Sequence, residues 1–329
     1  MRMIAASTLF LFSLLCAATT FATDFAWETF DFPDADSTFL YGIENEQMVG
    51  WYRETGGEGA TSDNGFLYDS SIEGSPWSTL NFPLGSDTHL HAINDGNVVG
   101  SFVDGDGKRQ GVSYNLDSQQ WTPYDGAING VQASDLFDVD GDKMVGYSVG
   151  LNGAKQGSYY DGTQWSTLNY PGQAAGQENS FFHAINEEHI IGSYIDNSGS
   201  SPVEHGIVYD TETLSWHQLD NPDAELTYLY EVEGAYLVGA YTDSTGLHGF
   251  HYDSVMEAWQ TIDHPQGGTH TALHGIDGNN MVGFYRDSNN NFHGFKVTGE
   301  FGQTEVVPEP AALLLALFGL ALLPRRRRR

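Results

Sequence analysis

The chain has 329 residues, with 44 acidic and 13 basic side chains and a formal net charge of −31 at pH 7. A surface this acidic repels phosphate backbones and anionic lipid, so nucleic-acid binding is excluded as a function class, whereas divalent cations and neutral or cationic partners are favoured. The only cysteine, Cys16, lies in an N-terminal apolar stretch that we expect to be removed. The mature protein is therefore expected to have neither a disulfide nor a cysteine metal site.

The N-terminus has the features of a secretory signal peptide. Arg2 precedes an apolar stretch from Ile4 to Cys16, and the small-residue site Thr20-Phe21-Ala22 is typical of signal-peptidase cleavage before Thr23. The sequence therefore predicts a signal peptide over residues 1–22 and export of the rest of the chain.

Residues 23–300 consist of six related units. Each unit contains an apolar residue followed by glycine, and these pairs lie 44 to 50 residues apart. The six pairs are Val49-Gly50, Val99-Gly100, Val145-Gly146, Ile191-Gly192, Val238-Gly239 and Val282-Gly283. A second glycine follows in each unit: Gly65, Gly111, Gly157, Gly206, Gly249 and Gly294. A period in the forties, with turn residues between short β-prone runs, is typical of β-propeller blades.

The sequence thus predicts an all-β, six-bladed β-propeller with about four strands in each unit. In the first unit we expect these strands near Leu40 to Ile43, Met48 to Arg53, Gly65 to Tyr68 and Trp77 to Phe82. The alternation of side chains within them fits packed sheets better than a helical period.

The outer Trp-containing segment is present in five units and missing from the sixth. After Gly294 to Val297 no such segment follows, but one occurs at the N-terminus as Trp27 to Phe32. An open array would expose two sheet edges, which invite aggregation. We therefore expect Trp27 to Phe32 to form the outer strand of the last blade and to close the ring.

Short elements of these units resemble those of the secreted HAF-type repeat proteins of bacteria. The elements are His91-Ala92-Ile93-Asn94, His183-Ala184-Ile185-Asn186 and His248-Gly249-Phe250, and the likeness covers about Trp27 to Val297. The third unit departs most, with Leu136-Phe137-Asp138-Val139-Asp140 in place of the first element. The resemblance implies an exported protein of repeat architecture and does not define an activity.

Several short patterns resemble catalytic or calcium sites. Gly146-Tyr147-Ser148-Val149-Gly150 matches a nucleophile elbow, but it is the repeated strand of its unit and no helix pattern follows, so no catalytic residue is predicted. Asp138, Asp140 and Asp142 have calcium-loop spacing but lack the loop glycine and the bidentate glutamate, which excludes an EF-hand. We expect hairpin turns, with weak calcium binding as the alternative, at Asp104 to Gly107 and Asp287 to Asn290.

One set of residues suggests a metal in the central channel. Eight residues before each apolar–glycine pair stand Tyr41, His91, Phe137, His183, Tyr230 and His274. The three histidines, His91, His183 and His274, fall on alternate blades, so neutral imidazoles from three directions would converge on a metal if this strand lines the channel. The alternative is that a ring of aromatic and histidine side chains packs the inner strands.

The C-terminus combines three ordered parts. Val307, Pro308, Glu309 and Pro310 are followed by an apolar run from Ala311 to Leu323 and, after Pro324, by Arg325, Arg326, Arg327, Arg328 and Arg329. Prolines keep the first part extended, the apolar run can enter a bilayer, and the arginines stay on the cytoplasmic side. Thirteen apolar residues are short against the ~20 that span the hydrocarbon core, which argues against an ordinary tail anchor.

This order of parts resembles the PEP-CTERM sorting signal of bacteria that secrete exopolysaccharide. The resemblance implies a linker over 301–307 and a signal over 308–329, which a membrane-embedded exosortase cuts near Pro308-Glu309-Pro310. The membrane is then a partner only before processing, and the body is released or re-anchored outside.

The features together favour a non-enzymatic propeller at the cell surface or in the extracellular matrix or biofilm. Its partner is expected to be polysaccharide or a surface protein, with exposed aromatics such as Trp51, Tyr124 and Tyr170 as stacking surfaces. No cofactor is expected apart from weak calcium or the channel metal. The alternative is a secreted hydrolase or lyase acting on glycans, which a cluster of carboxylates, arginine and tyrosine at one channel mouth would favour.

Overall fold

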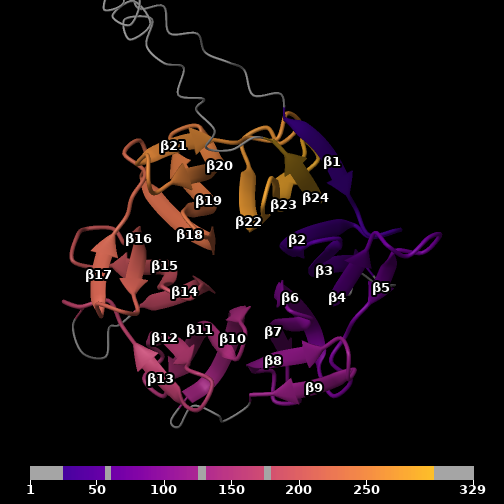
Figure 1. Ribbon diagram of the computed structural model, residues 1–329, viewed down its shortest axis with the longest axis horizontal. Helices are drawn as coiled ribbons and strands as arrows, with labels where there is room; N and C mark the ends of the chain where they lie inside the picture. The colour runs from indigo at the N-terminus through magenta and orange to yellow at the C-terminus, as the bar shows by residue number, and fades with distance from the viewer. Residues whose placement is uncertain (1–24, 56–60, 125–130, 174–178, 300–329) are drawn as a thin grey trace, which may run out of the picture.

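The computed structural model describes residues 25–55, 61–124, 131–173 and 179–299. These residues form 24 strands, which pair into six antiparallel sheets of four strands each, arranged in a ring (Figure 1). The prediction of an all-β, six-bladed propeller is confirmed for this part of the chain. In the same residues no helix is long and apolar enough to cross a membrane. The predicted signal peptide, linker and sorting signal lie outside the described ranges.

The four strands of each sheet follow one another outward from the ring axis (Figure 1). The innermost, or first, strands are β2 (Ser37–Glu44), β6 (Ser86–Asn94), β10 (Val131–Asp140), β14 (Ser180–Ile185), β18 (Leu226–Glu233) and β22 (Thr271–Asp277). The second strands are β3 (Gln47–Thr55), β7 (Asn97–Val103), β11 (Lys143–Gly150), β15 (His189–Asp196), β19 (Tyr236–Asp243) and β23 (Asn280–Arg286). The third strands are β4 (Thr61–Asp69), β8 (Arg109–Asn115), β12 (Lys155–Tyr160), β16 (Val203–Asp210), β20 (Gly246–Asp253) and β24 (Phe292–Thr298).

The outer strands are short, and each carries one of six tryptophans. They are β5 (Trp77–Thr79), β9 (Gln120–Pro123), β13 (Trp165–Leu168), β17 (Ser215–Gln218), β21 (Ala258–Thr261) and, in the sixth sheet, β1 (Ala26–Phe30). Strand β1 pairs antiparallel with β24, and Trp27 lies opposite Val297. Strand β1 therefore lies in the same sheet as β24, which is the last strand of the described residues (Figure 1).

The hydrophobic core lies between neighbouring blades. In one cluster Ala92 and Val99 of the second blade pack against Leu136, Val139 and Met144 of the third. At the position of Leu136 every blade has a large apolar side chain that is at most 2% exposed: Leu40, Leu90, Leu136, Phe182, Leu229 and Leu273. Sheets buried on both faces need apolar residues on both, which explains the runs of valine and isoleucine in the second strands.

A β-bulge recurs at the same place in all six first strands. The pairing with the second strand shifts by one residue at Tyr41, His91, Phe137, His183, Tyr230 and His274. The residue before each bulge pairs with the glycine of the apolar–glycine pair, as Phe182 does with Gly192. A Cβ on Gly192 would collide with the carbonyl oxygen of Phe181, and the other five glycines have the same constraint. The repeated glycines are thus required by close strand approach at the bulge.

Candidate functional site

The six bulged residues form a continuous layer of rings around the channel. Neighbouring ring centroids lie 4.1 to 5.2 Å apart, and the contacts run through Tyr41, His91, Phe137, His183, Tyr230 and His274 and back to Tyr41. An aromatic ring separates each pair of histidines. The bulges lie on the innermost strands of the ring, and the mutual contacts of these six side chains pack the inner strands together.

The channel histidines are held as neutral side chains. His91 Nδ1 donates to the carbonyl oxygen of Leu136 at 2.8 Å, and His183 Nδ1 donates to that of Leu229 at 2.9 Å, each in the following blade. Burial lowers the pKa of all three histidines. The pKa of His183 falls to about 4, and that of His274 falls well below its usual value. Among the described residues no group of three or more His, Cys, Asp or Glu side chains is placed to hold a metal ion. The metal at His91, His183 and His274 stays a prediction.

We expect His274→Phe to leave the melting temperature unchanged or to raise it. His274 stacks between Tyr230 and Phe284, so a phenyl ring keeps these contacts and removes a half-buried imidazole. Thermal unfolding and elemental analysis of the native protein check this. Near-stoichiometric zinc, copper or nickel that is lost in the variant would instead support the histidines as ligands.

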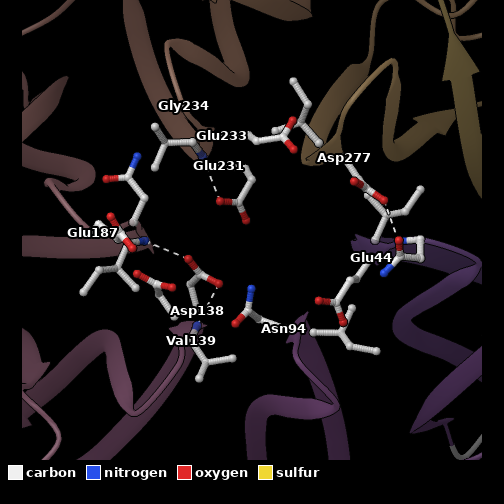
Figure 2. Close-up of a pocket in the computed structure, with 17 residues that line it drawn as sticks. Glu44, Asn94, Asp138, Val139, Glu187, Glu231, Glu233, Gly234 and Asp277 are labelled. Carbon is white, nitrogen blue, oxygen red and sulfur yellow. Dashed lines mark hydrogen bonds between the residues drawn. The ribbon is translucent and has the colours of Figure 1, made fainter.

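A cavity of about 350 Å³ lies at one end of the channel (Figure 2). It is lined where the first strands turn into the second strands, by residues from all six blades. We call this end the acidic mouth, because its lining includes seven carboxylates: Glu44, Asp138, Asp140, Glu187, Glu231, Glu233 and Asp277.

Two of these carboxylates point toward the middle of the cavity (Figure 2). Asp138 accepts hydrogen bonds from the backbone N–H groups of Val139 and Ile185, both at 2.7 Å, and so ties the third blade to the fourth. Glu231 accepts one from Val232 at 2.8 Å. Burial raises the pKa of Asp138 to about 7 and that of Glu231 well above its usual value. From the sequence, Asp138 is a candidate only within the excluded calcium-loop pattern, and Glu231 is not singled out. The other units have Gly42, Ala92, Ala184 and Gly275 at this position.

Glu231→Gln is expected to stabilise the protein at pH 8 and to have less effect at pH 5. A carboxyl group with a raised pKa keeps its proton in the folded state after the unfolded chain has lost its own, so stability falls as pH rises toward the folded pKa. Glutamine removes this penalty, roughly 1 kcal/mol or more at pH 8, and keeps an acceptor for Val232. Denaturant unfolding at both pH values measures it. Exposed Glu73→Gln is the control, and an equal gain at both pH values would contradict the assignment.

The opposite end of the channel has a different composition. In each blade, three positions lie on the other side of the bulge from the acidic mouth. The first is on the first strand, two residues before the bulge, and the second is the residue paired with it on the second strand. The third is on the third strand, two residues before the second glycine of the unit. We call this end the mixed mouth. In blade order its residues are Phe39, Trp51 and Asp63; His89, Ser101 and Arg109; Asp135, Tyr147 and Lys155; Phe181, Ser193 and Glu204; Tyr228, Ala240 and Leu247; Ala272, Phe284 and Phe292.

The mixed mouth has a charged half and an apolar half. All charged residues of the set come from blades one to four, whereas blades five and six contribute aromatic and aliphatic side chains. Several charges are held in place: Asp63 accepts from Arg53 at 2.7 and 2.9 Å, and Ser193 Oγ donates to Glu204 at 2.6 Å. The Lys155 ammonium lies over the rings of Tyr147 and Phe181, 5.2 and 5.0 Å from their centroids.

The expectation that Trp51 is an exposed stacking surface is wrong. Its side chain is 7% exposed, and its ring stacks on Phe39 and on His89, with centroids 3.8 and 4.2 Å away. Sequence alone does not show which rings of the next blade cover a tryptophan. Tyr124 and Tyr170 are half-buried, and Tyr170 stacks on Tyr194.

The other short patterns lie in ordinary positions of the fold. Ser148 lies within β11, fully buried, and its hydroxyl accepts a hydrogen bond from Ser158 at 2.9 Å. Asp104 caps a turn by accepting from the backbone of Asp106 and Lys108, and Asp287 does the same for Asn289 and Asn291. The last two segments are therefore hairpin turns, as expected.

No family model matches the chain, and no curated protein matches it. Among solved structures, TolB from Acinetobacter baumannii is similar with a TM-score of 0.51 and 11% identity, over 78% of this chain and 66% of that one. An acylaminoacyl peptidase from Pyrococcus horikoshii is similar with a TM-score of 0.50 and 8% identity, over 79% of this chain and 51% of that one. This chain thus spans less than two thirds of either protein. At such identities the likeness shows the propeller fold alone.

Proposed function

We propose that this chain is an exported, non-enzymatic propeller that binds polysaccharide outside the cell at the mixed mouth. The observation that carries the proposal is the difference between blades at this one end. Equivalent positions in the core between blades keep one kind of residue, as with the buried Leu40 and its five counterparts, whereas at the mixed mouth they range from Phe39 to Asp135 and Arg109. Side chains that depart from a repeat at one mouth are the expected result of a ligand site on a repeated scaffold.

The composition of the mixed mouth suits carbohydrate. Half-buried aromatic side chains such as Phe284 and Phe292 offer apolar surface for the C–H faces of a sugar, and fixed charges offer hydrogen bonds to its hydroxyls. The acidic net charge favours a neutral ligand over an anionic one.

The experiment is a binding measurement with the purified exported protein against an array of extracellular glycans. Retention of at least one polysaccharide, lost on unfolding, is the expected result. Retention of none would sink the proposal.

We also propose that the N-terminal strand closes the ring and that an exosortase processes the C-terminus. The pairing of β1 with β24 supports the first part, and the order of segments from Val307 to Arg329 supports the second. Mass spectrometry of the protein from its native host tests the processing. An intact C-terminus that still carries all five arginines would overturn it.

One observation favours the alternative of a secreted glycan hydrolase or lyase. The mixed mouth holds three carboxylates, Asp63, Asp135 and Glu204, together with Arg109 and Tyr147. Burial raises the pKa of Glu204, as in general acids of such enzymes. Release of reducing ends or of unsaturated sugars from a bound polysaccharide would establish this alternative in place of simple binding.

A further inference from the structure

A buried carboxylate at the mixed mouth has an oxygen without a hydrogen bond. Asp135 is 5% exposed, and its Oδ1 has no hydrogen-bond partner among the described residues. His91 Nδ1 lies 3.5 Å from this oxygen and donates to the carbonyl oxygen of Leu136 instead. Buried polar atoms are nearly always paired, because an unpaired one costs a large part of its lost hydration. The carboxylate thus has acceptor capacity that the described residues do not fill, and the 8% of its side chain that stays exposed is where a donor from outside the chain can reach it.

Asp135 is directed toward the channel. Its Oδ1 lies beside His91, which belongs to the ring layer around the channel. Asp135 pairs across the strands with Tyr147, and burial raises the pKa of that phenol to about 12, which keeps its hydroxyl protonated. The negative charge of Asp135 adds to this rise and the positive charge of Arg109 opposes it. The strands that carry Asp135 and Arg109 are in contact, because the N–H of Gly111 donates to Ser134 Oγ at 3.0 Å.

Arg109 has donors to spare in the same region. Its Nη1 donates to Ser101 Oγ at 2.8 Å, which fixes the guanidinium, and within the described ranges it forms no ion pair with a carboxylate. Arg53 of the first blade differs, because its Nε and Nη2 both donate to the carboxylate of Asp63. An arginine without an acidic partner is unexpected in a chain with 44 acids and 13 bases.

The neighbouring charges limit the kind of ligand. A carboxylate or phosphate would be repelled by Asp135 and by the net charge of the protein, and an ammonium group would be repelled by Arg109 and Lys155. A hydroxyl group both donates and accepts, so one hydroxyl can bond to Asp135 while its neighbour accepts from Arg109. Adjacent hydroxyls on a ring with apolar C–H faces are the chemistry of a neutral sugar.

We propose that the mixed mouth binds a neutral sugar unit, with Asp135 accepting a hydrogen bond from one hydroxyl and Arg109 donating to a neighbouring one. This rests on the proposed polysaccharide binding and names the ligand class and the residues that recognise it. Tyr228, Phe284 and Phe292 line the apolar side of the same mouth.

The test is titration calorimetry of the exported protein with six hexasaccharides of different charge. Laminarihexaose, cellohexaose, mannohexaose and xylohexaose are neutral, hexagalacturonate is anionic, and the chitosan hexamer is cationic. We expect at least one neutral probe to bind, and Asp135→Asn and Arg109→Gln each to weaken it about tenfold or more, because hydrogen bonds to charged groups are among the stronger ones. Asp140→Asn at the acidic mouth is the matched control and should bind as the unaltered protein does.

A stability measurement separates ligand recognition from a structural role. Asparagine at position 135 removes an unpaired buried charge, so the melting temperature should stay the same or rise while binding falls. If Asp135→Asn does not fold, Arg109→Gln carries the binding test.

The outcomes distinguish the two proposals. If no glycan binds the unaltered protein, on the array or among the hexasaccharides, polysaccharide binding itself is wrong. If a neutral probe binds equally to the unaltered protein and to the folded variants, or if only hexagalacturonate or the chitosan hexamer binds, the Asp135–Arg109 site is overturned while polysaccharide binding stands.

Discussion

Replacing Trp27 with alanine should lower the free energy of unfolding by about 3–5 kcal/mol, the usual cost of truncating a core tryptophan. The Trp27 ring packs against Phe295 and His264, with centroids 5.4 and 5.0 Å away, at the edge of a core cluster that includes Leu273 and Val297. The substitution also weakens the attachment of β1 to β24, whose edge would otherwise be open. Denaturant unfolding measures the change.

Two matched variants control this prediction. Trp165→Ala removes the equivalent side chain of the third blade, which packs on Tyr160 at 5.2 Å, and should cost a similar amount. Glu28→Ala, on the same strand as Trp27, removes only an exposed ion pair with Lys296 at 3.2 Å and should cost less than about 1 kcal/mol. A Trp27→Ala protein with an unchanged melting temperature would argue against a ring closed by its N-terminal strand.

Gly192→Ala is expected to destabilise the fold by at least about 3 kcal/mol, at the upper end of the range for overpacking. The added Cβ would collide with the Phe181 carbonyl oxygen and with the backbone of Phe182, where β14 and β15 approach closely before the His183 bulge. Relief requires moving the first strand, and with it a ring of the channel layer. Thermal unfolding together with near-UV circular dichroism reports both effects.

Gly105→Ala is the control for this second prediction. A Cβ at Gly105 meets no heavy atom within 4 Å, and the change should stay within about 0.5 kcal/mol. Equal melting temperatures for the two alanine variants would show that the repeated glycines are not required by strand approach at the bulges.

The repeat made the blades predictable from the sequence. The contacts between neighbouring blades could not be predicted in this way. The apolar–glycine pairs and the Trp segments mark strands that follow one another in the sequence, so their spacing is enough to locate these strands. The four strands of the first unit are confirmed near their expected bounds. The bulge at His91 and its equivalents leaves no separate signal in the sequence, because the extra residue shows only as a pairing shift. The covering of Trp51 by His89 likewise depends on how adjacent blades pack.

The two mouths illustrate the same limit for the site. Asp138 and Glu231 stand where other units have glycine or alanine, so an alignment of the units would have drawn attention to them. The unpaired oxygen of Asp135 had no such signal in the sequence, because a missing hydrogen bond depends on where His91 and Leu136 place their polar atoms. The composition predicted a general preference for neutral or cationic partners. Which charged side chains lie at which mouth is visible only in the three-dimensional structure.

The most direct measurement of the central claim is hydrogen–deuterium exchange with and without the tightest-binding neutral hexasaccharide. We expect slower exchange at the mixed mouth, in the segments 86–91, 103–111 and 131–137 that carry His89, Arg109 and Asp135. Exchange around the acidic mouth, at 44–47 and 231–236, should stay unchanged. Protection at the acidic mouth alone, or binding without protection at either mouth, would contradict a sugar site at the mixed mouth.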